Sequence, residues 1–482
     1  MRSLAAALVL LAVPLQPAIA ADISYEGATA LEKKLTTYIP ENFVKDGLIK
    51  VRPGTTDYEV IFDPNVLLKD INPVDVTVTG LKPLLSLVRP LEDGLWSFAQ
   101  DADLDVKGTF TVGPEKTDFT YRIDKMHSDG VVDPDLLYFK SLAMKADGLA
   151  FTSKSPKQTI EAYFANMTGT LNATREGADT VDVRSNSTLG AFTEAVTDDK
   201  NTRVDIAAQS IIADAAVNGL RYKPLQEIVF FVLDRARQQK LTSEEEMRLK
   251  KLVRSNLPLF DQLLETIEFA GLRVATPQGE FGAESARYNI SADGLRDGAS
   301  FSFGFGVEKP TTPPNLVPIV YRQAIPESLD FEIGVKDVNV ASGLNYFLDN
   351  ASFTAEKPLT DAQSAELGRV ILPDGALHLT YKNVSARSSI YDVTLTGETT
   401  VYPELKGRQK TDVTIVAHDF DKTVSYLQDN AKAVPQYGQA AFVLLMIKGF
   451  AKETADGGQS WRLEIDENNR MKVNGRDMAI PH

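Results

Sequence analysis

Few residues of this 482-residue chain have the type and spacing that catalysis or metal binding requires. The four histidines, His127, His378, His418 and His482, stand far apart, and no two of them have the short spacing of a metal-binding or catalytic pair. Because cysteine is absent, neither a thiolate metal site nor a cysteine nucleophile can form. The sequence therefore predicts a protein that is not an enzyme, with no catalytic residue, no metal site and no cofactor.

Three alternate aspartates, Asp101, Asp103 and Asp105, have the spacing with which a calcium-binding loop begins. Such a loop needs glycine at its sixth position and glutamate at its twelfth, and this chain has Val106 and Val112 there. We therefore interpret the aspartates as the solvent-facing side of a charged strand.

Alternation of apolar and polar residues is the dominant pattern, and it is typical of strands that are buried on one face only. Because antiparallel sheets commonly have one wet face, the pattern predicts an antiparallel sheet. A sheet of so many strands twists and curls. The predicted fold class is α+β, with a large curved, mainly antiparallel sheet, a central helical hairpin and short helices packed on one face. The alternating segments are 58–63, 74–80, 104–112, 118–124, 168–174, 180–187, 203–209, 286–294, 300–308, 329–340, 376–384, 391–401, 410–419, 460–466 and 470–475.

Helical periodicity predicts a hairpin at about 220–271, which divides the strand-rich regions. Its second helix has a candidate capping box, Ser243 with Glu246, and a glycine stop at Gly271. A second capping box is predicted at Thr360 with Gln363, and an apolar helix follows Pro435. Short helices are also expected directly after strands, within 76–88, 182–196, 338–350 and 414–430.

The predicted organisation has four parts. Residues 1–20 have the cation, apolar core and small residues of a cleavable signal peptide, with cleavage after Ala20. Residues 21–307 form an N-terminal β region that contains the helical hairpin. Residues 308–318 hold four prolines and predict a stiff connector. Residues 319–482 form a C-terminal β region with short helices.

The signal peptide predicts a periplasmic location and a mature chain without an integral membrane segment. Cleavage removes Arg2, which leaves 50 Lys plus Arg against 66 Asp plus Glu, a net charge of −16. So acidic a protein is repelled by nucleic acid and by anionic lipid surfaces at long range. Nucleic acid is therefore excluded as a partner.

The signal peptide, the alternating strands and the segments "VDVTVTG", "DFEIGVKDVNV", "YDVTLTGETTV" and "LEIDENNRMKVNG" together resemble uncharacterised bacterial envelope proteins. The chain is similar to the domain-of-unknown-function family twenty-one twenty-five and, more distantly, to the YdgA-like proteins. The resemblance implies a long curved antiparallel sheet and a role at the cell envelope, and it supplies no catalytic residues.

Two functions fit these observations. The first is an exported, non-enzymatic envelope protein that binds a lipid or another amphipathic small molecule in a groove between the sheet and the helices. Its candidate groove residues are Leu225, Ile228, Val229, Val232, Leu233, Phe442, Leu445 and Met446. The second is a structural or protein-interaction module that contacts another envelope protein through its sheet edges.

Overall fold

The structure is a computed structural model that describes residues 23–37, 39–69, 76–112, 115–235, 241–352, 357–405 and 408–478. The expected signal peptide and its cleavage site, together with His482, lie outside the described residues.

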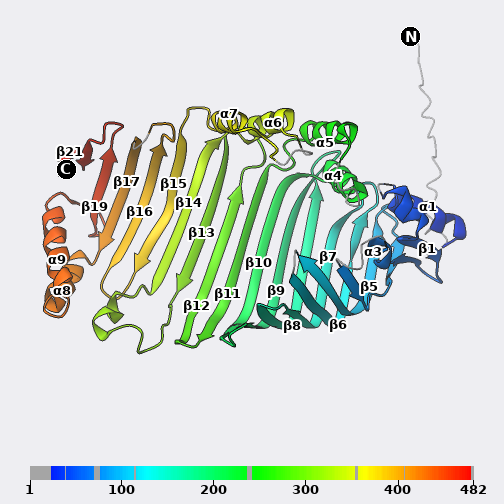
Figure 1. The fold of residues 1–482 in the computed structure, drawn as a ribbon, viewed down its shortest axis with the longest axis horizontal. Coiled ribbons are helices and arrows are strands. Elements are labelled where there is room, and N and C mark those ends of the chain that lie inside the picture. Colours follow the sequence, from blue (N-terminus) through cyan, green and yellow to red (C-terminus); the bar gives the residue numbers. More distant parts are fainter. Residues whose placement is uncertain are drawn as a thin grey trace, which may run out of the picture.

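The strands of the described residues form one open antiparallel sheet, which runs along the whole molecule from β1 at one edge to β21 at the other (Figure 1). The predicted fold class, a large α+β fold built on an antiparallel sheet, is confirmed. The strands are β1 (Ile49–Pro53), β2 (Tyr58–Phe62), β3 (Val76–Thr79), β4 (Leu84–Pro90), β5 (Trp96–Val112), β6 (Glu115–Asp133), β7 (Tyr138–Lys154), β8 (Gln158–Arg175), β9 (Thr180–Asp198), β10 (Arg203–Arg221), β11 (Gln262–Thr276), β12 (Gly279–Ala292), β13 (Ala299–Glu308), β14 (Ser328–Val338), β15 (Leu377–Arg387), β16 (Asp392–Val401), β17 (Gln409–His418), β18 (Lys452–Glu453), β19 (Gln459–Ile465), β20 (Met471–Val473) and β21 (Arg476–Met478).

The helices lie around the border of the sheet. Figure 1 shows α4 to α7 along one long side, where strands end, α1 at one short end, and α8 with α9 at the other. The helices are α1 (Tyr25–Leu35), α2 (Glu41–Lys45), α3 (Asn65–Leu68), α4 (Tyr222–Arg235), α5 (Ser243–Ser255), the 3-10 helix η1 (Ile319–Ala324), α6 (Val340–Asn350), α7 (Asp361–Ile371), α8 (Phe420–Asn430) and α9 (Pro435–Lys448).

The strand register shows that the two faces of the sheet differ in chemistry. Directly paired residues lie on the same face, so the pairs can be followed from strand to strand as one row, which we call the central row. It contains no charged residue, and its face is mainly apolar. The row consists of Val51, Val60, Ser86, Gln100, Ser128, Met144, Gly169, Ser187, Ala213, Ile267, Tyr288, Phe305, Phe331, Val384, Leu395, Ile415 and Trp461.

The opposite face is polar and carries ion pairs between strands. The guanidinium of Arg462 donates two hydrogen bonds, of 2.8 and 2.6 Å, to the carboxylate of Asp412. This contact lowers the pKa of Asp412 below its usual value. A second pair joins Lys336 to Glu398 at 2.7 Å. We call the two sides of the sheet the apolar face and the polar face.

An interruption crosses seven neighbouring strands at one level. In each of these strands one residue has no cross-strand partner, although pairing resumes on both sides of it. The unpaired residues are 124, 148, 165, 191, 209, 271 and 284. The backbone is left-handed at Gly148, Ala191 and Gly271. The register is the same on both sides of each gap, so no residue is inserted and the line is not a row of β-bulges. We call this interruption of the pairing, which crosses β6 to β12, the crease.

Several predicted helices are strands in the structure. The second helix of the hairpin ends at Ser255, and residues 262–276 form β11, which pairs with strands on both sides. Residues 84–90 and 180–198 are likewise strands, not short helices. In each case pairing with two neighbours outweighs a local pattern that also fits a helix. The helices expected within 338–350 and 414–430 are confirmed as α6 and α8.

Of the two predicted capping boxes, one is confirmed and the other lies one residue away from the predicted position. Thr360 and Gln363 form the predicted box at the start of α7. At α5 the box consists of Thr242 and Glu245, one residue before the predicted pair.

The proline-rich segment 308–318 lies between two paired strands. β13 ends at Glu308 and pairs with β14, so the sheet continues across this segment without a break. Residues 309–327 therefore form an excursion from one end of the sheet.

The buried core is divided into small clusters, and three of them lie where a helix covers the apolar face. α1 packs on β2, β4 and β5, α4 packs on the ends of β7 and β9, and α8 with α9 packs on β17 and β19. Among the described residues the largest fully buried side chain is Val181. Most of the apolar face is therefore only partly buried.

Candidate functional site

An exposed aromatic surface lies in the middle of the apolar face. Four side chains of β12 to β14 leave 37–47% of their surface in contact with solvent, although they lie on the face that carries the core elsewhere. They belong to none of the buried clusters. We call this surface the open aromatic face, and it consists of Ile290, Phe303, Phe305 and Phe331.

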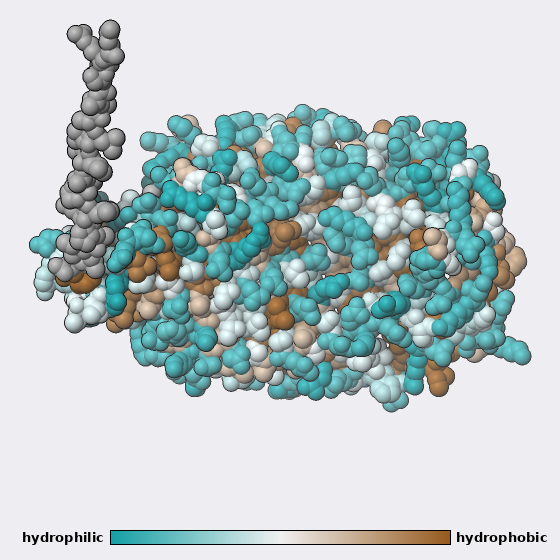
Figure 2. All heavy atoms as spheres, turned by 180° about the vertical axis from the view of Figure 1, so that it is seen from behind, coloured by the Kyte–Doolittle hydropathy of each residue, from teal (hydrophilic) through white to brown (hydrophobic). Residues whose placement is uncertain are grey.

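Apolar residues also reach the surface in Figure 2, where brown side chains lie in a band along the long axis, bordered on both sides by hydrophilic residues. A large contiguous apolar surface on a folded protein marks a binding site.

One strand, β15, separates this surface from a cavity of about 460 Å³ at the end of the apolar face, which we call the C-terminal pocket. Its floor is formed by strands β16, β17, β19 and β20, and its cover by α8 and α9. Ligand pockets for small molecules have volumes of roughly 300–1,000 Å³. Its lining residues include Val393, Ile415, Ala417, Leu444, Ile447 and Trp461.

The polar groups in the walls of the C-terminal pocket are bonded to the protein. Trp461 donates from Nε1 to the carbonyl of Ile447 at 2.8 Å, and the hydroxyl of Thr423 donates to the carbonyl of Ile390 at 2.8 Å. The hydroxyl of Tyr391 donates to the carbonyl of Ala324 at 2.9 Å, and burial raises the pKa of Tyr391. A ligand in this pocket therefore meets hydrocarbon, and these groups offer it no free hydrogen-bond donor.

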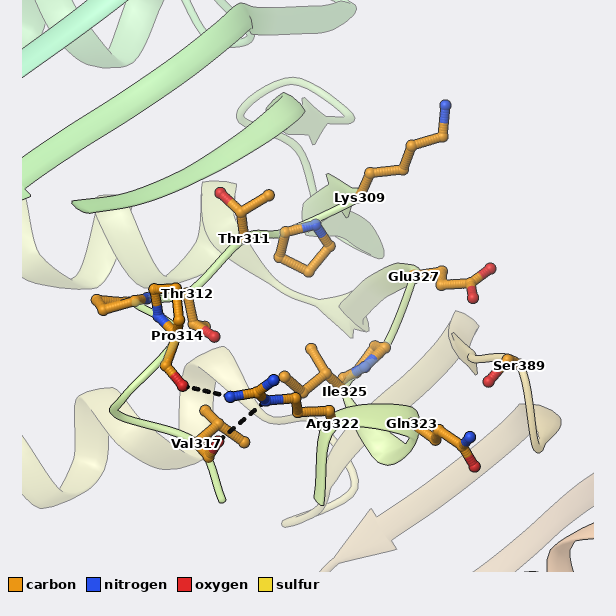
Figure 3. A pocket seen from close by; sticks show the side chains of 13 residues that line it. Lys309, Thr311, Thr312, Pro314, Val317, Arg322, Gln323, Ile325, Glu327 and Ser389 are labelled. Carbon is orange, nitrogen blue, oxygen red and sulfur yellow. Dashed lines mark hydrogen bonds between the residues drawn. The ribbon is translucent and has the colours of Figure 1, made fainter. Parts of the chain in front are cut away.

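A second cavity, of about 540 Å³, lies beside the excursion of residues 309–327 and is more polar (Figure 3). Arg322 extends across it and donates to the carbonyls of Pro314 and Val317, at 2.6 and 3.4 Å. Lys309 points away from Arg322 in this view and pairs with Glu284. The two cavities are neighbours, because Ser389 lines this one and Tyr391 lines the C-terminal pocket.

The candidate groove residues of α4 do not form one buried surface. Val229 and Val232 are exposed, and Leu225 and Ile228 are half-buried at the border of the sheet. The side chain of Leu233 lies outside the described residues.

The candidate groove residues of α9 lie on the outer side of that helix. Phe442, Leu445 and Met446 are exposed, whereas Leu444 and Ile447 of the same helix line the C-terminal pocket. Sequence reasoning missed the strand residues of the pocket, although alternation around Ile415 and Trp461 places both on an apolar face.

The three described histidines lie on separate strands and contact polar neighbours. His127 bonds Asp101 at 2.8 Å, His378 bonds Thr400 at 3.2 Å, and His418 bonds Asp456 at 3.0 Å. Hydrogen bonds from Thr454 and then from His418 lower the pKa of Asp456 from 3.8 to about 2. Within the described ranges no group of three or more His, Cys, Asp or Glu side chains is placed to hold a metal ion.

Two of the three alternate aspartates make separate contacts with cationic or polar neighbours. Asp103 pairs with Lys82 at 2.9 Å, and Asp101 contacts His127 on the neighbouring strand. These contacts are those of a charged strand surface.

No described helix combines the length and the apolar character needed to cross a bilayer. The similarity to bacterial envelope families stays a prediction. Comparison with protein-family models, with curated proteins and with solved structures found nothing that matches this chain.

Proposed function

We propose that this chain is an exported, non-enzymatic protein that binds the hydrocarbon part of a lipid or of another amphipathic molecule on its apolar face. The observation that carries the proposal is the C-terminal pocket, an apolar cavity of about 460 Å³ on the same face of the sheet as the open aromatic face. Burial of apolar surface is the driving force for binding in such a site.

The dimensions of the apolar face support a lipid. From Ile267 to Trp461 the central row crosses eight strands with mainly large apolar side chains. Seven strand spacings measure roughly 34 Å, and the hydrocarbon core of a bilayer is about 30 Å thick with both leaflets. An acyl chain of a membrane lipid therefore fits across the strands, with its end in the C-terminal pocket.

The sheet edges give less support to a bridging module. β1 has five residues and ends at Pro53, and β21 has three residues. An added strand needs a longer row of free backbone donors and acceptors. The ligand-binding function is therefore the one that we propose.

Native mass spectrometry of the purified protein, with a titration by a fluorescent fatty acid, tests this proposal. We expect co-purifying lipid and saturable uptake of the probe. Val393→Phe fills the C-terminal pocket from a rigid strand and should weaken uptake at least about tenfold. Thr394→Phe, on the opposite face of the same strand, is the matched control and should leave uptake unchanged. Absence of lipid together with absence of uptake would refute the proposal.

A further inference from the structure

The helix α9 is apolar on both sides, although only one side is covered. Its inner side chains, Ala441, Leu444 and Ile447, face the sheet. On the outer side Phe442 is 64% exposed and Met446 56% exposed, and Val443 and Leu445 are exposed beside them. A helix that is apolar all round is normally buried, so the outer side of α9 lacks its covering.

The excursion of residues 309–327 extends this surface. The ring of Tyr321 in η1 packs edge-on against Tyr437 of α9, with ring centroids 5.9 Å apart. The hydroxyl of Tyr426 in α8 donates to the carbonyl of Val320. Ile319, beside these contacts, is 79% exposed, and Leu316 is 52% exposed. We call the combined surface the apolar tip, and it consists of Leu316, Ile319, Phe442, Val443, Leu445 and Met446.

Two sequence segments that contribute to the apolar tip carry only cationic charged residues, although the protein as a whole is acidic. Residues 431–452 contain Lys432, Lys448 and Lys452 and no carboxylate, and residues 309–326 contain Lys309 and Arg322 and no carboxylate. The complete chain has a net charge of −15. Lys448 pairs with Asp421 and Lys309 with Glu284, whereas Lys432, Lys452 and Arg322 have no carboxylate within 4 Å in the described part of the chain.

The geometry points to a lipid bilayer as the partner of the apolar tip. Exposed aliphatic and aromatic side chains beside lysine and arginine are the combination that inserts into a membrane surface and attracts anionic headgroups. The tip lies at one short end of the molecule, where a bilayer can approach it (Figure 1).

This inference does not depend on the ligand-binding function, but the two agree in their geometry. α9 separates the apolar tip from the C-terminal pocket, since its two sides contribute to the two features. The net charge of the whole protein predicts repulsion from anionic lipid surfaces at long range. Cationic residues beside the tip can still bind such a membrane at short range.

Vesicle flotation with the full-length mature protein tests the inference. One set of vesicles contains phosphatidylcholine alone, and the other contains phosphatidylcholine with phosphatidylglycerol. We expect binding to both sets and tighter binding to the anionic vesicles. Phe442→Gln with Met446→Gln should lower partitioning into both sets about tenfold or more, because two inserted side chains are lost. Gln keeps the helix propensity of the position.

Two further variants make the test specific. Met247→Gln changes a methionine of α5 that is 64% exposed but directly follows the carboxylates Glu244, Glu245 and Glu246. This variant should bind vesicles as the unchanged protein does. Lys432→Glu with Lys452→Glu should reduce binding to anionic vesicles and leave binding to phosphatidylcholine unchanged.

Three results would overturn the inference. The first is that the unchanged protein floats with neither set of vesicles. The second is that Met247→Gln loses as much vesicle binding as Phe442→Gln with Met446→Gln. The third is that the protein is a dimer in solution, which Phe442→Gln with Met446→Gln converts to monomer. The last result would assign the tip to a second copy of the chain.

Discussion

The two halves of the central row differ in the size of their side chains. From Ser86 to Ala213 the row contains small or polar residues at most positions, among them Ser128, Gly169 and Ser187. From Ile267 onward large apolar and aromatic residues predominate. The crease crosses mainly the strands of the first half, and the C-terminal pocket lies at the end of the second. Along the central row, the first half therefore contains the interrupted pairing, and the second half contains the large apolar side chains.

Within the second half, the covered end and the open aromatic face should respond differently to truncation. Trp461 is 7% exposed and bonds Ile447, so Trp461→Ala should cost about 3–5 kcal/mol in the free energy of unfolding. Phe303 is 47% exposed, and Phe303→Ala should cost less than about 1.5 kcal/mol. Urea denaturation of both variants measures this difference. Equal losses would mean that the open aromatic face is a packed core.

The crease of the first half can be tested at Gly148, whose φ is +64°. A Cβ at this position would lie 2.1 Å from the Asp124 carboxylate oxygen Oδ2. Gly148→Ala should therefore cost about 2–3 kcal/mol in the free energy of unfolding. Gly375 has φ +63°, and a Cβ added there would have no atom within 4 Å, so Gly375→Ala carries the backbone cost alone, about 1 kcal/mol. A Gly148→Ala variant no less stable than Gly375→Ala would contradict this expectation.

A smaller effect is expected at Asp456, which contacts His418 at the end of β17. Its pKa is lowered from 3.8 to about 2, so its contribution to stability is present above pH 3.8 and is lost as the pH falls through about 2. Asp456→Asn should lower Tm slightly at pH 6, and this difference should vanish between pH 4 and pH 2. A difference in Tm that is constant down to pH 2 would show that the carboxylate does not act through its charge.

Much of the sheet could be predicted from the sequence, because alternation records which side chains share a face. All the alternating segments contain strands, including "VDVTVTG" at 74–80 and "YDVTLTG" at 391–397. β11 was missed because "QLLETIEFAG" fits a helix as well as a strand, and only its pairing with β10 and β12 decides between them.

The residues of the C-terminal pocket could not be predicted from local sequence patterns. α9 is apolar on all sides, so its sequence does not show which side faces the sheet. The pocket also joins residues from Tyr391 to Met478, and their proximity follows from the order of the strands. The sequence therefore predicted the helix that covers the site and could not predict the residues inside it.

Photo-crosslinking of the purified protein with a fatty acid that carries a diazirine near its methyl end tests hydrocarbon binding most directly. Mass spectrometry of the digested protein then locates the labelled peptides. We predict labels in β12 to β19 and α9, at the open aromatic face and the C-terminal pocket, and loss of the pocket labels in Val393→Phe. Labels confined to β5 to β10, or unchanged in Val393→Phe, would contradict the assignment of hydrocarbon binding to the second half of the sheet.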